Sequence, residues 1–194
     1  MTRATDTLAP AYFDALYARD SDPWRLASSA YEREKYAATI GALPQPGYDS
    51  ALEVGCSIGV LTRRLAPLCR RLLAVDAAET PLKEAMGRCA DAPNVQFQKM
   101  FAPGQWPDGT FDLILLSEIV YYLSRDDVER LGSRIGDSLA ARGDLVLVHW
   151  TDETDYPLTG DEAADGLIAC LAGVTEVARQ QRFPQFRIDV LRRR

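Results

Sequence analysis

The sequence has little basic charge, a single histidine and no long apolar run. Acidic residues outnumber basic ones by 28 to 22, which gives a net charge of -6 over 194 residues. Because a protein that grips phosphates along DNA or RNA needs a basic face, we predict no nucleic-acid partner. The most apolar run, Phe111 to Leu123, is too short to span a bilayer and contains Glu118, so we predict no membrane association.

Cysteine pairing is also missing, since none of the four cysteines belongs to a CxxC motif. The chain therefore lacks the spacing of a zinc or redox site, and we predict no bound metal. The first residues, Met1 to Asp6, are polar and have no apolar signal core, so we expect a cytoplasmic protein.

A Pro- and Gly-rich stretch, Leu43 to Tyr48, divides the chain into a helical arm (1–47) and a core (48–194). The arm is too short to form a core of its own, so residues 1–194 are predicted to form a single domain. Ser29 and Glu32 have the spacing of a capping box, which predicts an arm helix that runs to about residue 43.

Short apolar runs alternate with helical patterns after this break, which indicates right-handed βαβ units and a parallel sheet. Thr80 with Pro81 is typical of a helix start, and Gly143 of a helix end. The predicted strands are Ser50–Val54, Arg71–Val75, Asn94–Gln98, Phe111–Leu116 and Asp144–His149, and the predicted helices between them lie near 58–66, 80–90 and 125–140.

The last third has a different pattern. Thr159 and Glu162 predict a capped helix that runs to about Leu171. Two runs near 174–181 and 186–191 are joined too tightly for a crossover helix, so we predict an antiparallel hairpin. The predicted fold class is therefore α/β, with a mostly parallel seven-stranded sheet, a C-terminal antiparallel hairpin and an N-terminal helical arm.

The densest motif runs from Ala51 to Gly59, where a strand ends, a turn holds two glycines and a helix begins. Ser57 stands where a dinucleotide fingerprint has the glycine that lets the backbone approach a pyrophosphate. Glu53, on the strand before the turn, instead suits a cationic ligand. Asp76 ends the next apolar run, where a carboxylate can accept hydrogen bonds from both ribose hydroxyls. The motif favours a nucleoside ligand, and a dinucleotide stays open because Asp76 suits it equally.

Several short segments make the pattern more specific: Asp22–Arg25, Tyr31–Arg33, Ala51–Gly59, Ser117–Glu118, Tyr121–Leu123 and Val148–Trp150. Together with five βα units closed by a hairpin, they resemble class I methyltransferases, which have a Rossmann-like fold and bind S-adenosylmethionine (SAM). Within that class they resemble the nodulation protein S family, whose members N-methylate the amino sugar of a lipo-chitooligosaccharide precursor. Similar bacterial proteins are fused to sugar deacetylases. The resemblance covers roughly residues 10–150.

This resemblance implies a SAM site that releases S-adenosylhomocysteine (SAH). Trp24 and Tyr31 would close the arm over the cofactor, with packing of the arm as an equal alternative. Phe101 departs from the family pattern, in which an Asp often accepts a hydrogen bond from the adenine amine. The remaining implied contacts are Glu53, Gly55, Cys56, Ser57 and Gly59 at the methionine part, Asp76 and Ala77 at the ribose, Met100 with Phe101 at the adenine, and Ser117.

Glu118 and His149 follow adjacent predicted strands. Ligands of open α/β sheets bind beyond the carboxyl ends of the strands, so both side chains could face the acceptor. We predict His149 as the general base, because an ordinary imidazole has a pKa of about 6.5, with Glu118 orienting the acceptor or the base. A buried, hydrogen-bonded histidine is an equal alternative.

The predicted reaction is methyl transfer from SAM to a small-molecule acceptor, namely an amine nitrogen on an amino sugar or a related metabolite. Two alternatives stay open: an O-methyltransferase for hydroxylated small molecules, and a non-catalytic SAM-binding module. A nicotinamide dehydrogenase is the least favoured. The fused relatives also imply a sugar deacetylase as a functional partner.

Overall fold

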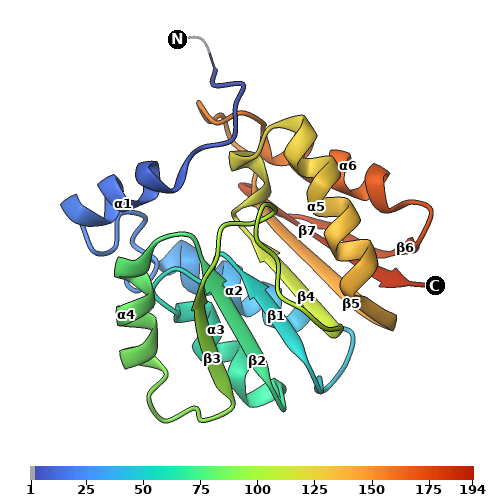
Figure 1. Ribbon diagram of the computed structural model, residues 1–194, viewed down its shortest axis with the longest axis horizontal. Helices are drawn as coiled ribbons and strands as arrows, with labels where there is room; N and C mark the ends of the chain where they lie inside the picture. The colour runs from blue at the N-terminus through green and yellow to red at the C-terminus, as the bar shows by residue number, and fades with distance from the viewer. Residues whose placement is uncertain (1–2) are drawn as a thin grey trace.

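The computed structural model describes residues 3–194, so Met1 and Thr2 of the predicted arm lie outside the described residues. Its strands are β1 (Ala51–Val54), β2 (Leu72–Asp76), β3 (Val95–Lys99), β4 (Phe111–Ser117), β5 (Leu139–Trp150), β6 (Thr175–Arg182) and β7 (Phe186–Arg193). They form a seven-stranded sheet in the order β3-β2-β1-β4-β5-β7-β6 (Figure 1).

The strand order determines where a ligand can enter. Strand β1 pairs in parallel with both β2 and β4, so the chain leaves β1 toward one edge and later returns to its other side. The crevice at such a switch point lies beyond the carboxyl ends of the strands and is the usual ligand site of open α/β sheets. Strand β7 runs antiparallel to both β5 and β6, so the sheet is mixed and the predicted C-terminal hairpin is confirmed.

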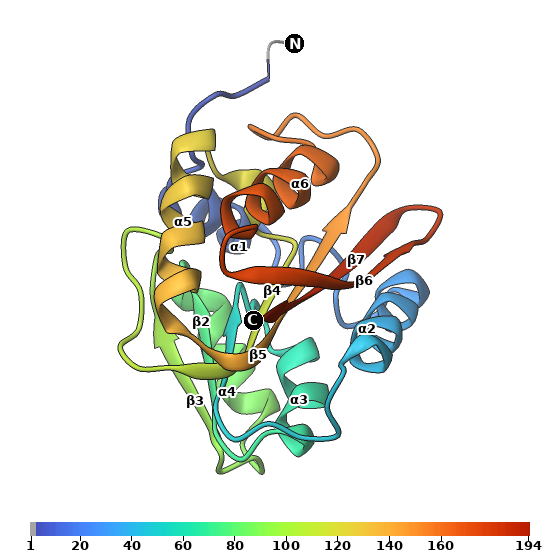
Figure 2. The same cartoon turned by 90° about the vertical axis from the view of Figure 1, so that its right-hand side faces the viewer.

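Helices cover both faces of the sheet. They are α1 (Pro10–Arg19), α2 (Ala30–Ala42), α3 (Val60–Leu65), α4 (Glu79–Arg88), α5 (Arg125–Ser138) and α6 (Gly160–Leu171), with 3₁₀ helices η1 (Ala66–Leu68) and η2 (Val120–Tyr122). Helices α2 and α3 lie on one side of the sheet, and α5 and α6 lie on the other (Figure 2). Helix α1 packs beside α4 through Tyr17, which contacts Ile58 and Ala78.

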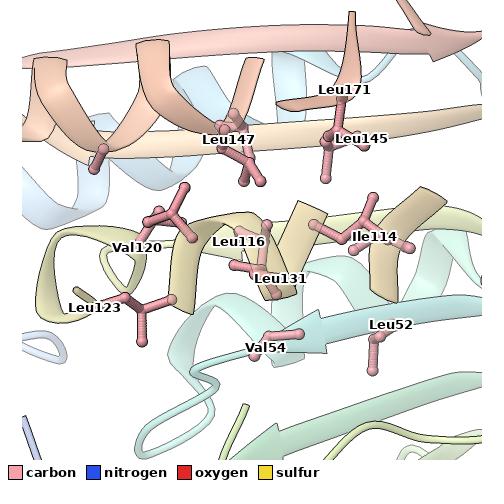
Figure 3. Close-up of a cluster of buried hydrophobic side chains, with 14 of the residues drawn as sticks. Leu52, Val54, Ile114, Leu116, Val120, Leu123, Leu131, Leu145, Leu147 and Leu171 are labelled. Atoms are coloured by element: carbon pink, nitrogen blue, oxygen red, sulfur yellow. The ribbon is translucent and has the colours of Figure 1, made fainter. Parts of the chain in front are cut away.

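The central strands are apolar on both faces, as a sheet covered on both sides requires. Alternate residues of β4 and β5 point to opposite faces, so Leu116 and Leu147 belong to the core under α5 and α6, whereas Leu115 and Val148 belong to the core under α2 and α3. Figure 3 shows the first of these clusters, in which Leu131 of α5 fits among the leucines of the strands.

Helices α4 and α5 lie where they are predicted, but two of the predicted capping residues are wrong. Helix α4 begins at Glu79 with Ala78 as its N-cap, so Thr80 lies inside the first turn and caps nothing. Helix α5 ends at Ser138, and Gly143 lies within β5. A Cβ at Gly143 would approach the carbonyl oxygen of Ala140 to 2.8 Å, so this glycine permits a tight irregularity where the pairing of β4 and β5 shifts register.

The other predicted caps are present. Ser29 Oγ accepts a hydrogen bond from the amide of Glu32 and starts α2, although the Glu32 side chain turns away to Lys35. At α6 the capping box is complete, because Thr159 and Glu162 bond each other's backbone amides. Ser29 thus fixes where the arm helix begins and which of its residues face the sheet.

Candidate functional site

The turn between β1 and α3 owes its shape to two glycines. Gly55 has φ +83° and Gly59 has φ +77°, conformations that side-chain-bearing residues rarely adopt. A Cβ at Gly55 would lie 2.2 Å from Cγ2 of Ile119, and a Cβ at Gly59 would lie 2.8 Å from Cβ of Ala85. Gly55 therefore lets the loop after β4 come close to the turn, and Gly59 lets α3 start tightly against α4.

Asp76 ends β2 beside this turn. Its Oδ2 accepts a hydrogen bond from the amide of Ser57 and its Oδ1 accepts one from the amide of Ala78, both at 2.9 Å. Burial raises the pKa of Asp76 even though these amides favour its ionised form. The Tyr17 hydroxyl hydrogen-bonds Ser57 Oγ and so ties the arm to the same turn. Asp76 is thus held in place by the turn that it faces.

A cavity of about 420 Å³ opens at the switch point. Its walls come from the arm, the β1 turn and the carboxyl ends of β4 and β5. Most of the predicted site residues line it, namely Trp24, Tyr31, Glu53, Gly55, Cys56, Ser57, Asp76, Ser117 and Glu118.

A smaller, mainly apolar cavity of about 70 Å³ adjoins the first and shares Gly55 and Asp76 with it. Predicted residues line this one as well: Ala77, Met100 and Phe101. The Phe101 side chain has no hydrogen-bonding group, so a polar edge of any ligand here must bond backbone atoms or solvent.

Glu53, on β1, is 1% exposed, and its carboxyl lies near Thr62 of α3. Burial raises the pKa of its carboxyl to about 7. Its Oε2 has no hydrogen-bond partner among residues 3–194. Because burial disfavours the charged form of this carboxyl, a cationic group placed in the cavity would stabilise that form.

Glu118 joins three parts of the site and adopts a positive φ of 60°. Its Oε1 accepts a hydrogen bond from Lys35 Nζ at 2.6 Å. Its Oε2 accepts two more at 2.8 Å, from the Tyr121 hydroxyl and the Trp150 amide. Both oxygens are therefore engaged in holding the arm, η2 and β5 together around the cavity.

Residues of the arm that sequence reasoning missed complete this end of the cavity. Lys35 is 3% exposed and also donates to Glu32 Oε1 at 2.9 Å. Burial acts to lower the pKa of Lys35, but Glu118 and Glu32 outweigh it and raise the pKa above its ordinary value. The missed lining residues include Tyr17, Glu32, Lys35, Tyr36, Thr154 and Tyr156.

Aromatic rings form much of the same wall. Tyr31 meets Trp150 edge to face at 5.1 Å between ring centroids. Tyr121 stacks on Tyr156 at 5.2 Å with an interplanar angle of 20°. Trp24 packs against Tyr17 rather than against the core of the sheet, so the arm carries its own aromatic contact over the cavity. These rings form a flat, apolar part of the cavity wall beside the carboxylates of Glu32 and Glu118.

Two predicted site residues lie away from the cavity walls. Gly59 acts through packing of α3 on α4, as described above. His149 is fully buried in β5 beside Tyr121, and it lines neither cavity in the described part of the chain. Burial lowers its pKa to about 4, and neither ring nitrogen has a partner among the described residues. The predicted base is thus separated from the cavity, and its predicted pKa of about 6.5 does not hold.

A metal centre was not expected from the sequence. Across residues 3–194, no group of three or more His, Cys, Asp or Glu side chains is arranged to hold a metal ion.

Comparison with known proteins identifies relatives of this protein. Residues 14–149 match the family model of nodulation protein S (NodS). Nodulation protein S of Bradyrhizobium diazoefficiens is 38% identical over 109 residues, which make up 56% of this chain and 52% of that protein. The chain spans about half the length of the curated relatives that it matches.

Solved structures support the same relationship. A Pseudomonas syringae protein described as a candidate methyltransferase is 32% identical, has a TM-score of 0.72, and is covered in full by 85% of this chain. The N-methyltransferase NodS from Bradyrhizobium japonicum WM9, solved with SAH, is 23% identical with a TM-score of 0.81 over 94% of this chain and 97% of that one, which shows a shared fold. Because the family model matches well over half of the sequence, the protein belongs to the nodulation protein S family.

Proposed function

We propose that this protein transfers a methyl group from SAM to an amine nitrogen of a small-molecule acceptor. The observation that carries the proposal is the cavity at the switch point, which is lined by Asp76 and by Glu53, whose Oε2 has no partner among residues 3–194. Family membership supports the same activity, since the solved NodS of Bradyrhizobium japonicum WM9 is an N-methyltransferase by name.

The residues present fit SAM in its separate parts. Asp76 would accept hydrogen bonds from the ribose hydroxyls, because its carboxylate oxygens have lone pairs beyond those taken by the two amides. Glu53 would compensate the positive charge of the methionine part. The apolar walls of the smaller cavity, formed partly by Met100 and Phe101, would cover the adenine ring. When bound, SAM supplies an activated methyl group on its sulfonium.

The protein's own contribution is to position the two reactants and to exclude water from them. Holding two reactants in line can supply about 7–11 kcal/mol of the barrier. Tyr17, Trp24 and Tyr31 of the arm line the cavity and limit its access to solvent. Both oxygens of Glu118 accept hydrogen bonds, and these bonds connect the arm to the end of β5. Glu118 therefore fits a role in positioning the cavity walls.

The acceptor we propose is an amine on an amino sugar or a related metabolite. The aromatic wall offers flat faces to the C–H surface of a sugar, and the neighbouring carboxylates suit a cation. An O-methyltransferase remains the second candidate, because the same wall suits a hydroxylated ring. Supply of the acceptor by a sugar deacetylase and a cytoplasmic location stay predictions from the sequence.

Two experiments test the proposal. Calorimetry with SAM, SAH and NAD, side by side, should give measurable binding of the first two only, and binding of NAD alone would overturn it. Labelled SAM with deacetylated amino sugars, their N-acetylated parents and catechols then decides the acceptor. Methylation of catechols alone would favour the O-methyltransferase, and SAM binding without turnover on any acceptor would favour a binding module.

A further inference from the structure

Glu32 is a charged residue of the cavity wall to which the proposed function gives no role. It lies on α2, is 6% exposed, and lines the larger cavity. Its Oε1 accepts a hydrogen bond from Lys35 at 2.9 Å, whereas its Oε2 has no partner among the described residues. The Tyr36 hydroxyl lies close enough to Glu32 for this carboxylate to raise the pKa of Tyr36, but a carboxylate has lone pairs enough to accept from a further donor as well.

The other ionisable groups nearby are already engaged. Both oxygens of Glu118 accept hydrogen bonds from protein donors. Lys35 is held as a cation between two carboxylates, so it cannot accept a proton from an acceptor. His149 lines neither cavity. Glu32 is therefore the carboxylate in this part of the wall with an oxygen that accepts no hydrogen bond from residues 3–194.

The charges at this end of the cavity do not balance. Glu32 and Glu118 contribute two carboxylates, and Lys35 contributes one ammonium. A buried negative charge that is not compensated is unfavourable, and a bound cation would compensate it. Tyr31 and Thr154 also line the cavity, and the Tyr31 hydroxyl and Thr154 Oγ1 have no hydrogen-bond partners in the described chain. A ligand with an amino group and neighbouring hydroxyls could form hydrogen bonds with Glu32, Tyr31 and Thr154.

We propose that Glu32 selects the acceptor by accepting a hydrogen bond from its amino group, with Tyr31 and Thr154 bonding adjacent hydroxyls. The acceptor class that follows is a small polyhydroxylated amine. Selection arises because a protonated amine gains from the excess negative charge, whereas an alcohol or an amide of the same shape does not. The bound ammonium then loses one proton to solvent, which frees the nitrogen lone pair to attack the methyl group. The proposal rests on the proposed methyl transfer, because it names the acceptor side of the same cavity.

The test uses the full chain loaded with SAH, and glucosamine as the probe, with glucose and N-acetylglucosamine as neutral counterparts. Glu32→Gln should weaken glucosamine binding by about tenfold or more and leave binding of the two neutral sugars unchanged. SAH affinity should be unchanged. In turnover with SAM, the KM for glucosamine should rise by a similar factor, with a smaller change in kcat. Glu34→Gln, on the exposed side of the same helix, is the matched control and should change none of these values.

Each outcome decides the matter. Wild-type affinity for glucosamine in a folded Glu32→Gln variant overturns the proposal, as does wild-type protein that binds SAH but does not prefer glucosamine to glucose. If Glu32→Gln does not fold, Glu32→Asp replaces it, because it keeps the charge beside Lys35 but withdraws the carboxylate. Its KM for glucosamine should rise several-fold, and an unchanged KM overturns the proposal. Failure of wild-type protein to bind SAH would instead reject the proposed function itself.

Discussion

Lys35 Nζ lies 2.6 Å from Glu118 Oε1 and joins the arm helix to the loop that follows β4. The pair is largely buried, with side-chain exposures of 3% and 20%. Since the same ammonium also bonds Glu32, one lysine of α2 holds two carboxylates at the cavity. The arm is therefore fixed to the sheet by charge as well as by apolar packing.

Removal of this lysine should destabilise the whole fold. Lys35→Met leaves Glu32 and Glu118 without their cation, and breaking a buried pair in this way costs about 3–5 kcal/mol. Urea unfolding followed by circular dichroism measures the loss. Lys83→Met is the control, because Lys83 is 74% exposed beside Glu79 and should cost less than about 1 kcal/mol. Equal small effects of both substitutions would mean that the buried pair adds nothing to stability.

Asp76 should matter for ligand affinity more than for folding. Asp76→Ala removes the acceptor of the proposed ribose hydrogen bonds, each on the order of 1.5–3 kcal/mol when charged, so SAH binding should weaken by at least tenfold. Asp112→Ala is the matched control, because Asp112 likewise bonds two backbone amides, those of Asp49 and Ser50, but lines neither proposed ligand cavity. Calorimetry that gives Asp76→Ala the SAH affinity of the control would remove Asp76 from the site.

Gly55 should tolerate no side chain. Gly55→Ala places a Cβ 2.2 Å from Ile119 Cγ2 at φ +83°, so crowding and backbone strain together should cost about 2–4 kcal/mol. Gly87→Ala meets no atom within 4 Å on α4 and should gain about 0.5–1 kcal/mol. Thermal unfolding of both variants checks the opposite signs. A stable Gly55→Ala variant with normal SAH affinity would show that the turn can rearrange.

The sheet and the glycine turn could be predicted because their signals are local. Continuous apolar runs such as the one in β4 indicate strands buried on both faces, and Gly55 with Asp76 at strand ends indicates a nucleoside site. The capping roles predicted for Thr80 and Gly143 were wrong, because capping residues also occur inside helices and at strand irregularities.

The acceptor end of the cavity could not be predicted in the same way. Glu32 and Lys35, three residues apart on a helix, have the pattern of an ordinary solvent-exposed pair. Only the packing of α2 against the β4 loop buries them, and that depends on contacts across more than 80 residues, such as Lys35 to Glu118. For the same reason, the sequence places His149 on the correct strand but does not reveal that its ring is buried outside both cavities.

Glu53 should make stability fall as pH rises. Its folded pKa of about 7 lies above the ordinary 4.5, so the folded chain keeps a proton that the unfolded chain releases. Its contribution to the free energy of unfolding is fully present below pH 4.5 and is lost as pH rises through 7. The loss is about 3 kcal/mol, because each pKa unit corresponds to about 1.4 kcal/mol. Urea unfolding across pH 5 to 8 should show this loss in the wild type and not in Glu53→Gln. Parallel curves for both proteins would rule out the raised pKa.

His149 should contribute to pH dependence in the opposite direction. Its folded pKa of about 4 lies below the ordinary 6.5, so below pH 6.5 the unfolded chain binds a proton that the folded chain refuses. Its contribution is present above pH 6.5 and is lost as pH falls toward 4, by about 3 kcal/mol. Because Glu53 acts oppositely over part of this range, the difference between wild type and His149→Gln isolates the histidine.

The same variant decides whether His149 takes part in chemistry. A general base must reach the proton that it removes, and its loss would cost about 10²–10⁴ in rate. His149 lines neither cavity and is held neutral by burial, so we expect His149→Gln to change kcat by less than about tenfold, to keep the wild-type SAH affinity, and to lose the acid-dependent part of stability. Measurement of kcat from pH 5.5 to 8.5 with an accepted amine checks this. A larger fall in kcat, together with loss of an inflection near pH 6.5 in the pH profile, would restore the histidine as the base. Only a group that exchanges protons with the acceptor changes both kcat and its pH profile.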